Sequence, residues 1–341
     1  MCVSKFNHQN TYKIEQSYIE KTNNLIIVAN SNQIDINIFA SLNSLLELEH
    51  FATSFNYRPK RQRVNSTLSG KHTSRMRGRG LDFEEVRLYV KGDDIRNIDW
   101  KVTARTQKTH TRVYTEEKEK PVLVIVDQSK AMFFGSVLRT KSVVAAELAA
   151  IVAFKVVKEG DRVGGIVYAD NGIDVIAPKR DRKTILHFLE KIAQRNQELQ
   201  SSTPVVFENA LAETVQRVKN IATHDFMVVL ISDFHRYSPR VIKSIHQIAA
   251  HNDVMLIKVF DPLEQSLPGT KFIAGNRTHQ IAIDGSNKTI RSNYTKGFDS
   301  DFYLFQEEMK KRGIPVFTVD TVNPIDQQLK DLFKINRKVK A

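Results

Sequence analysis

The chain has 341 residues, 41% of them hydrophobic and 9% aromatic, which is the composition of a folded protein with room for one large α/β domain and a smaller one. Its formal net charge is +13, and its single cysteine, Cys2, excludes an intramolecular disulfide and a thiolate-rich metal site and fits a reducing compartment. The first twenty residues lack a signal-peptide core, and the longest apolar run, 143–157, contains Glu147 and Lys155. We therefore expect a cytoplasmic protein with no membrane span.

The first part of the chain predicts little regular structure. Residues 1–37 show no clear period and are assigned to an N-terminal extension, with one strand expected at residues 24–29. Apolar residues then recur at helical spacing over 38–55, which predicts a helix that leads into a loop after Pro59. We place this helix, the loop and the charged segment that follows in a small α+β subdomain, residues 38–118.

A basic arm lies between residues 58 and 79, where eight basic residues occur without one acidic residue. Such an arm could contact phosphates, anionic lipid or an acidic protein face, and a solvated linker has the same composition. We do not expect nucleic acid to be the partner, although the arm keeps a nucleic-acid binder as an alternative function. The basic residues are Arg58, Lys60, Arg61, Arg63, Lys71, Arg75, Arg77 and Arg79.

A densely charged segment follows the arm, and neither helical nor strand periodicity explains its charges as one solvated face. Within its central sequence, YVKGDDIRNIDW, a glycine followed by two aspartates predicts a tight turn. The other charges favour a partly buried network of bidentate ion pairs that holds the small subdomain to the following domain. The alternative, a general acid/base pair that uses Asp93 or Asp94, has no nucleophile or base partner in the sequence. The residues of this network are Arg87, Gly92, Asp93, Asp94, Arg96, Asp99, Trp100 and Arg105.

Beyond Pro121 the pattern changes to short apolar runs separated by amphipathic helices. Five runs are predicted to be buried strands, at 121–127, 162–170, 225–233, 253–260 and 314–320. Helices are predicted between them, at 138–158, 180–194, 206–218, 239–251 and 300–312. Continuous β-branched strands that alternate with helices indicate a doubly wound, mostly parallel sheet covered on both faces, which we assign to residues 119–341.

Two of the predicted strands end in a carboxylate. Asp127 is followed by Gln128 and Ser129, and Asp233 is preceded by Ser232, so we expect two acids and two hydroxyls at one edge of the sheet. Ligands of such sheets bind outside the carboxyl ends of the strands, and hard oxygen ligands suit Mg²⁺. Aspartates also follow strands because their short side chains cap the next turn or helix, and from these residues alone we favour capping over metal binding.

No motif for nucleotide binding or nucleophilic catalysis occurs in the sequence. Gly78 and Gly80 follow no predicted strand, so they lack the context of a dinucleotide fingerprint, and there is no Walker-type lysine loop. The ten histidines form no HExxH motif, and none accompanies a GxSxG elbow. The sequence therefore gives no support to these two classes of enzyme.

Two segments resemble a known family. RGRGLDFEEVRLYVKGDDIRNIDWKVTART and, after a short spacer, EKPVLVIVDQSKAMFFGS resemble Domain of Unknown Function 58 (DUF58), a group of von Willebrand factor A-like proteins. The signature GDDxRxIDWxxxAR is long and specific, and the resemblance covers Leu42 to Asp233, with the rest following by strand order. It implies a von Willebrand factor A-type α/β domain behind a small subdomain. It also implies a protein-binding role and a partnership with MoxR-type AAA+ ATPases.

The resemblance further implies a metal-ion-dependent adhesion site, built from an Asp-x-Ser-x-Ser loop, a threonine from a second loop and an aspartate from a third. Asp127 and Ser129 match the first loop, but its last position is Ala131, which has no side-chain oxygen. Thr203 lies two residues from the threonine position, and Asp233 matches the third loop. We therefore expect a degenerate site that requires no cofactor, with Mg²⁺ as the ion that its remaining ligands would suit.

These observations predict a non-enzymatic adaptor that works with a MoxR-type AAA+ ATPase on a client protein. Its expected contact face is the edge formed by Asp127, Ser129 and Asp233. One alternative is a metal-dependent phosphoesterase with Asp127 and Asp233 as ligands and Asp93 or Asp94 as base. The other alternative is the nucleic-acid binder built on the basic arm.

Overall fold

The computed structural model describes residues 35–54, 81–116, 120–200, 210–235, 237–275 and 280–329. The chain divides into two compact units, a smaller one formed by Arg61–Lys120 and a larger one formed by the residues before and after it. The basic arm and the strand predicted at 24–29 lie outside the described residues. None of the helices that the structure describes is both long and apolar enough to cross a membrane.

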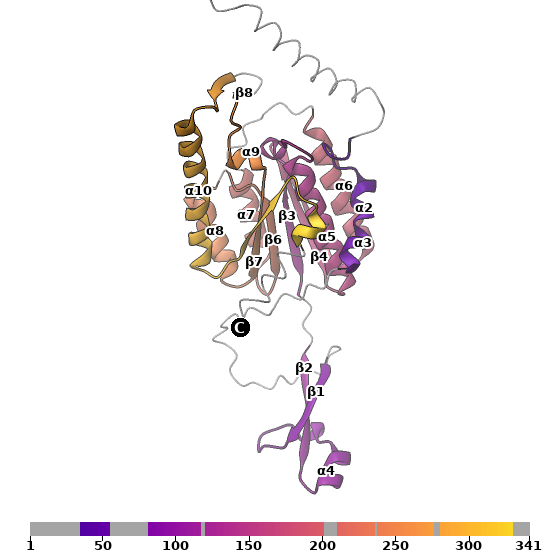
Figure 1. The fold of residues 1–341 in the computed structure, drawn as a ribbon. Helices are drawn as coiled ribbons and strands as arrows, with labels where there is room; N and C mark the ends of the chain where they lie inside the picture. Colours follow the sequence, from indigo (N-terminus) through magenta and orange to yellow (C-terminus); the bar gives the residue numbers. More distant parts are fainter. Residues whose placement is uncertain are drawn as a thin grey trace, which may run out of the picture. The chain divides into compact units, whose positions relative to one another are not determined.

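The larger unit is built on a six-stranded sheet with the strand order β10-β7-β6-β3-β4-β5 (Figure 1). Neighbouring strands are parallel, except that β5 is antiparallel to β4. The first strand of this sheet in chain order, β3, lies inside it and later strands are added on both sides, so the predicted doubly wound, mostly parallel sheet is confirmed. The strands are β3 (Val122–Asp127), β4 (Val163–Ala169), β5 (Gly172–Lys179), β6 (Met227–Ser232), β7 (Asp253–Phe260) and β10 (Val316–Asp320).

Helices cover both faces of this sheet. Alternate residues of β3 point to opposite sides, since Val124 belongs to the apolar cluster with α5 and α6, and Ile125 to the cluster with α7, α8 and α10. This is the period of two expected for a strand that is buried on both faces. The helices are α5 (Lys141–Lys158), α6 (Arg182–Glu198), α7 (Ala210–Ile221), α8 (Pro239–Ala249) and α10 (Lys288–Lys310).

Several elements of the larger unit differ from the sequence prediction. Strand β5 is not predicted, because Ile176 is its one buried residue and it lacks the continuous apolar run of the other strands. Helix α10 begins after its N-cap Asn287 rather than near residue 300. Its first turns are mostly polar, although Ile290, Tyr294 and Phe298 recur there at helical spacing. The shorter elements are η2 (Lys130–Met132), α9 (Pro262–Gln265) and a hairpin of β8 (Lys271–Gly275) and β9 (Gln280–Asp284).

Helices α2 (Leu42–Glu47) and α3 (Glu49–Ser54) also belong to the larger unit. Leu45 and Ala52 are buried in the same apolar cluster as α5 and α6. The predicted subdomain boundary at residue 38 therefore differs from the division in the structure. The smaller unit begins only at Arg61, because the apolar face of this helical segment packs on the sheet domain.

The smaller unit is an antiparallel hairpin whose connecting segment carries two short helices. Among the side chains whose burial is described in this unit, only Asp99 and Thr111 are buried. Backbone hydrogen bonds and ion pairs therefore contribute more to its structure than an apolar core does. Its elements are β1 (Leu81–Leu88), η1 (Ile95–Asn97), α4 (Trp100–Thr106) and β2 (His110–Glu116).

Candidate functional site

The candidate site lies where β3 and β6 end. These strands are parallel neighbours, with Val126 beside Ile231, so Asp127 and Asp233 leave the sheet at the same edge. Doubly wound folds bind their ligands at this edge. The sequence predicts this meeting of the two aspartates from the strand ends alone.

The predicted residues at this edge are buried rather than exposed. The exposed fractions are 4% for Asp127, 6% for Ser129 and 7% for Asp233. The expected contact face therefore needs correction, because these side chains point into the protein and do not present a surface to a partner. Thr203, the fourth residue predicted for the site, lies outside the described residues.

The Asp127 carboxylate accepts hydrogen bonds at both oxygens. Oδ1 accepts from the backbone N–H of Ser129 at 2.9 Å, and Oδ2 accepts from the hydroxyls of Ser232 at 2.6 Å and Tyr168 at 2.7 Å. Burial raises the pKa of Asp127, and the charge of Asp233 adds to the rise. Burial and the charge of Asp127 also raise the pKa of Tyr168, so the phenol keeps its proton and remains a donor.

Asp233 has different surroundings, because a lysine ammonium lies against it. Lys141 Nζ is 2.9 Å from Asp233 Oδ2 and 2.6 Å from Glu264 Oε1, and the lysine side chain is only 2% exposed. Burial acts to raise the pKa of Asp233, but the charge of Lys141 and the backbone N–H of His235 outweigh burial and lower it. Asp233 is therefore the carboxyl group of the two that ionises more readily.

Each parallel strand of the sheet ends in an aspartate or is followed directly by one. Each of these aspartates accepts a hydrogen bond from a backbone N–H group, and the bonds hold the turns and loops at this edge in place. Asp127 and Asp233 therefore make the hydrogen bonds that the capping interpretation predicts. The bonded pairs are Asp127 with Ser129, Asp170 with Lys130, Asp233 with His235, Asp261 with Leu263, and Asp320 with Val322.

The side-chain oxygens at this edge do not form the set of ligands that Mg²⁺ needs, because Mg²⁺ requires near-ideal octahedral geometry. Both oxygens of Asp127 and Oδ2 of Asp233 are engaged by protein donors, and Ala131 has no side-chain oxygen. Within the part of the chain that the structure describes, no group of three or more His, Cys, Asp or Glu side chains could hold a metal ion. The cation beside Asp233 is the ammonium group of Lys141.

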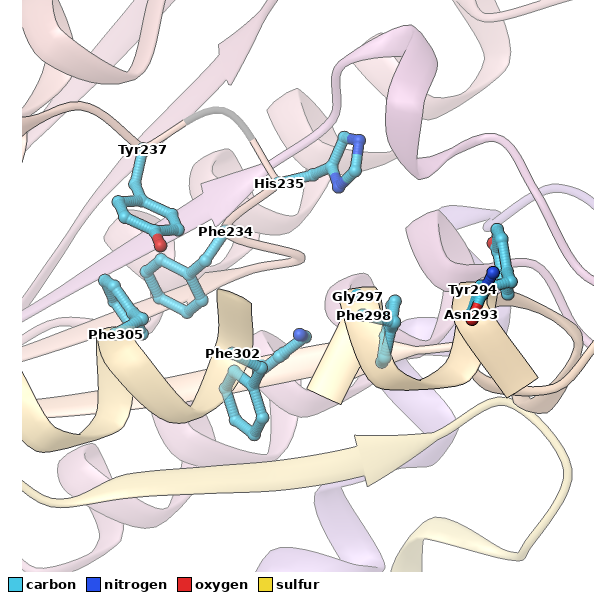
Figure 2. Close-up of a pocket in the computed structure, with 10 residues that line it drawn as sticks. Phe234, His235, Tyr237, Asn293, Tyr294, Gly297, Phe298, Phe302 and Phe305 are labelled. Carbon is cyan, nitrogen blue, oxygen red and sulfur yellow. The ribbon is translucent and has the colours of Figure 1, made fainter. Parts of the chain in front are cut away.

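An aromatic pocket of about 350 Å³ lies beside this edge, between the loop after β6 and helix α10 (Figure 2). Phe234, directly after Asp233, has a φ of 52°, a left-handed conformation that is uncommon for a bulky residue. Its ring stacks on Phe305 with the centroids 5.1 Å apart. The ammonium group of Lys258 lies 3.7 Å from the ring centroid of Phe302. The volume is in the range of small-ligand pockets.

Neither this pocket nor the roles of Lys141 and Glu264 are predicted from the sequence. Phe298, Phe302 and Phe305 recur at helical spacing, and this spacing is a signal that could mark one face of α10. Lys141 carries no comparable signal, because it is 92 positions from Asp233 and 123 positions from Glu264.

In the smaller unit the two aspartates of the GDD sequence serve local structure. Asp93 accepts from both terminal guanidinium nitrogens of Arg87, each at 2.8 Å, and from the backbone N–H of Val90 at 2.9 Å. The hydrogen bond from Arg87 lowers the pKa of Asp93. Asp94 is the N-cap of η1 and accepts from the backbone N–H of Arg96. Neither carboxylate is therefore placed as a free base.

Asp99 is the buried N-cap of α4, and its Oδ1 accepts from two backbone N–H groups in the first turn. Its Oδ2 binds Arg112 Nε at 2.8 Å, and this hydrogen bond lowers the pKa of Asp99. Arg112 lies on β2 and is absent from the predicted network, whose Arg96 and Arg105 are exposed. Residue spacing alone could not identify this partner, because the pair forms between β2 and the residue that caps α4.

The predicted network is therefore formed only in part. The ion pairs of Asp93 and Asp99 join residues within the smaller unit, which corrects the expectation that they fasten it to the next domain. Gly92 has a φ of 111°, which confirms the predicted turn, since glycine adopts this region without strain. Trp100 is 69% exposed and takes no part in a buried network.

Comparison with known proteins gives a family match. The family model described as "Protein of unknown function DUF58" matches residues 85–301. "Uncharacterized protein Rv1480" of Mycobacterium tuberculosis (strain ATCC 25618 / H37Rv) and "Uncharacterized protein Mb1516" of Mycobacterium bovis (strain ATCC BAA-935 / AF2122/97) are each 30% identical to this chain over 209 residues. The match covers 61% of this chain and 64% of each relative, which is less than two thirds of the relatives' length.

Similar solved structures include BatB from Bacteroides thetaiotaomicron, with a TM-score of 0.39, 19% identity, and coverage of 65% of this chain and 100% of that chain. An aerotolerance-related membrane protein from Bacteroides fragilis NCTC 9343 has a TM-score of 0.35 and 16% identity, and the match covers 64% of this chain and 98% of that chain. The assignment rests on the family match, which spans more than half of the chain and includes the GDD and DW signature. The protein belongs to the DUF58 family.

Proposed function

We propose that this protein is a non-catalytic, von Willebrand factor A-like adaptor that works with a MoxR-type AAA+ ATPase in the assembly or maturation of a client protein complex. The proposed setting is the cytoplasm, which fits the single cysteine of the chain. The ATPase partnership comes from the resemblance to DUF58 proteins. The observation that supports protein binding is the exposure of large apolar side chains in the family signature.

The signature segment, which we define as residues 88–105, exposes four large apolar side chains. Leu88 is 53% exposed, Val90 60%, Ile95 67% and Trp100 69%. Scattered apolar residues on a surface need no explanation, but several in one short segment indicate a binding surface, and tryptophan is enriched among residues that dominate binding energy. The aspartates of the same segment are used in caps and ion pairs. The segment is therefore better suited to binding than to catalysis.

The charge of the signature segment favours an acidic partner. Asp93 and Asp99 are neutralised by Arg87 and Arg112, which leaves Asp94 as the acidic residue of the segment outside an ion pair. Four exposed basic side chains occur in the same segment as the apolar residues, and charge complementarity to an acidic partner would guide association and orientation. These basic residues are Lys91, Arg96, Lys101 and Arg105.

The single tryptophan allows a direct test. Trp100 is the only tryptophan in the chain, so its fluorescence reports on the signature segment without labelling. Titration with a MoxR-type ATPase should shift the emission of Trp100 to shorter wavelength, because binding would remove the indole from water. Ile95→Ser should weaken this binding at least about tenfold, the loss typical of a central interface residue.

The control for this test is Val137→Ser, which changes an apolar side chain that is 74% exposed in the larger unit. This variant should bind like the wild type. Trp100→Ala, followed by calorimetry, measures the contribution of the indole itself. Unchanged affinity in both Ile95→Ser and Trp100→Ala would exclude the signature segment as the binding surface.

The alternative functions gain no support from the described residues. A phosphoesterase would need Asp93 or Asp94 as a free base, and both are engaged in their own unit. The arm proposed for nucleic acid lies outside the described residues.

A further inference from the structure

The first residue of α5, Lys141, brings a positive charge into the buried edge of the sheet. Its side chain is 2% exposed, and its ammonium group contacts Asp233 and Glu264 at 2.9 and 2.6 Å. Removing a lysine from water is costly unless its charge is paired. Here two carboxylates from different loops provide the pairing, one after β6 and one in α9.

The position of Lys141 in its helix is also unfavourable for a positive charge. It is the first residue of an 18-residue helix, where the backbone dipole disfavours a cation. Burial and the dipole therefore both act against a lysine at this position. A lysine that is placed here in spite of burial and the helix dipole indicates a specific role, which is to pair with the two carboxylates that it contacts.

The carboxylate bound by Lys141 is the one that the family resemblance assigns to a metal ion. Asp233 matches the third-loop ligand, yet its Oδ2 accepts from the lysine, while Asp127 accepts three hydrogen bonds and Ala131 has no side-chain oxygen. We infer that the ammonium group of Lys141 takes the place of a divalent cation at this edge. It neutralises Asp233 and joins the loop after β6 to α9.

The surroundings of Glu264 fit this role, because α9 is itself fastened to neighbouring loops. Asp261, the N-cap of α9, is fully buried and accepts from the backbone N–H of Ser136 and the hydroxyl of Thr321. Lys141 adds the contact to Asp233. These contacts join the loops after β3, β6, β7 and β10.

The contact itself balances the charge of Asp233. Lys141 Nζ lies 2.9 Å from Asp233 Oδ2, so the ammonium group is the cation that this carboxylate meets.

The test is to remove the lysine and ask whether a metal ion replaces it. Full-length wild type should bind no Mn²⁺ stoichiometrically by electron paramagnetic resonance, and millimolar Mg²⁺ should leave its Tm unchanged. Lys141→Ala should have a lower Tm, because Asp233 and Glu264 then lack their shared cation. It should also bind one Mn²⁺ per chain and recover part of the lost Tm in Mg²⁺, since ligand binding to the folded state raises stability. Lys141→Ala combined with Asp233→Asn should lose this Mn²⁺ binding.

The matched control is Lys155→Ala, which removes a lysine of the same helix that pairs with Glu159 at 3.0 Å. This variant should gain no Mn²⁺ binding. If Lys141→Ala does not fold, wild type and Glu264→Gln still decide the question, because neither should bind Mn²⁺ while Lys141 holds Asp233. Stoichiometric Mn²⁺ binding by the wild type that Asp233→Asn abolishes would overturn the inference. A folded Lys141→Ala protein that binds no Mn²⁺ would overturn it as well.

Discussion

Asp127 and Asp233 follow neighbouring strands at the same edge of the sheet, but their partners differ. Neutral hydroxyl groups and one backbone N–H bind Asp127, whereas an ammonium group binds Asp233. The pKa of Asp127 is therefore raised, first by burial and then by the charge of Asp233, and the pKa of Asp233 is lowered. The two nearby carboxyl groups therefore have divergent pKa values, and Asp233, which is in contact with the ammonium group of Lys141, ionises first.

The raised pKa of Asp127 leads to a prediction about how the stability of the protein depends on pH. The folded state binds the proton of Asp127 more tightly than the unfolded chain does, so the contribution of this residue to stability falls as the pH rises from the ordinary aspartate pKa through the raised one. Asparagine does not titrate. The stability advantage of wild type over Asp127→Asn should therefore shrink with rising pH, as measured by urea unfolding at several pH values.

Asp261 provides a control, because its pKa is shifted in the opposite direction to that of Asp127. Burial acts to raise its pKa, but the hydrogen bonds from Ser136 and Thr321 outweigh burial and lower it. The wild-type advantage over Asp261→Asn should therefore be present above the ordinary aspartate pKa and be lost as the pH falls through the lowered one. If both variants showed the same pH trend, the opposite pKa shifts would be wrong.

At the scale of elements, β4 and α6 approach each other through a glycine. A methyl group on Gly165 would lie 2.2 Å from two ring carbons of Phe188, whose side chain is 1% exposed. Glycine in a strand often marks such a close approach. The ring of Phe188 therefore fills space that any side chain at position 165 would need.

Gly165→Ala should destabilise the protein by about 1–3 kcal/mol, the usual cost of overpacking a core. Urea unfolding should show a lower midpoint with an unchanged slope. Adding Phe188→Leu should recover part of the loss, because the smaller side chain leaves room for the methyl group. A Gly165→Ala protein as stable as wild type would mean that the ring moves aside without cost.

Gly297 in α10 is the matched control, because replacing it by alanine is expected to have the opposite effect on stability. A methyl group there would meet no atom within 4 Å. Gly297→Ala should therefore stabilise the protein by roughly 0.5–1 kcal/mol, because alanine loses less backbone entropy than glycine in a helix. The two variants separate the effect of packing from the effect of helix propensity.

At the scale of the whole molecule, the two units depend on different interactions. The larger unit has two apolar clusters, one on each face of the sheet. The smaller unit has a hairpin, two helix caps and the ion pairs of Asp93 and Asp99. Its apolar side chains are largely exposed, which is the basis of the proposed binding surface.

Trp100 allows the state of the smaller unit to be followed in the whole protein. Because its side chain is 69% exposed, its emission maximum in the folded protein should already be that of an indole in water. Urea should therefore shift this maximum very little, while circular dichroism follows loss of the helices of the larger unit. A large red shift on unfolding would contradict the exposure of Trp100 in the free protein.

The amino-acid sequence by itself determined the sheet, the family and the meeting of Asp127 with Asp233. Strands buried on both faces need continuous apolar runs, and these runs are visible in the sequence without any partner. Parallel strands also end at a common edge, so residues that follow them must lie near one another. The GDD and DW signature identified the family for a different reason, because its residues are local in the sequence.

Only the tertiary structure decided which charges pair and which residues are exposed. Lys141 meets Asp233 across 92 positions, and Arg112 rather than Arg105 binds Asp99. Leu45 joins the core of the larger unit, although its helix lies next to the basic arm in the sequence. Ion pairing and burial depend on distances between side chains in space, and the spacing of residues along the chain does not specify those distances.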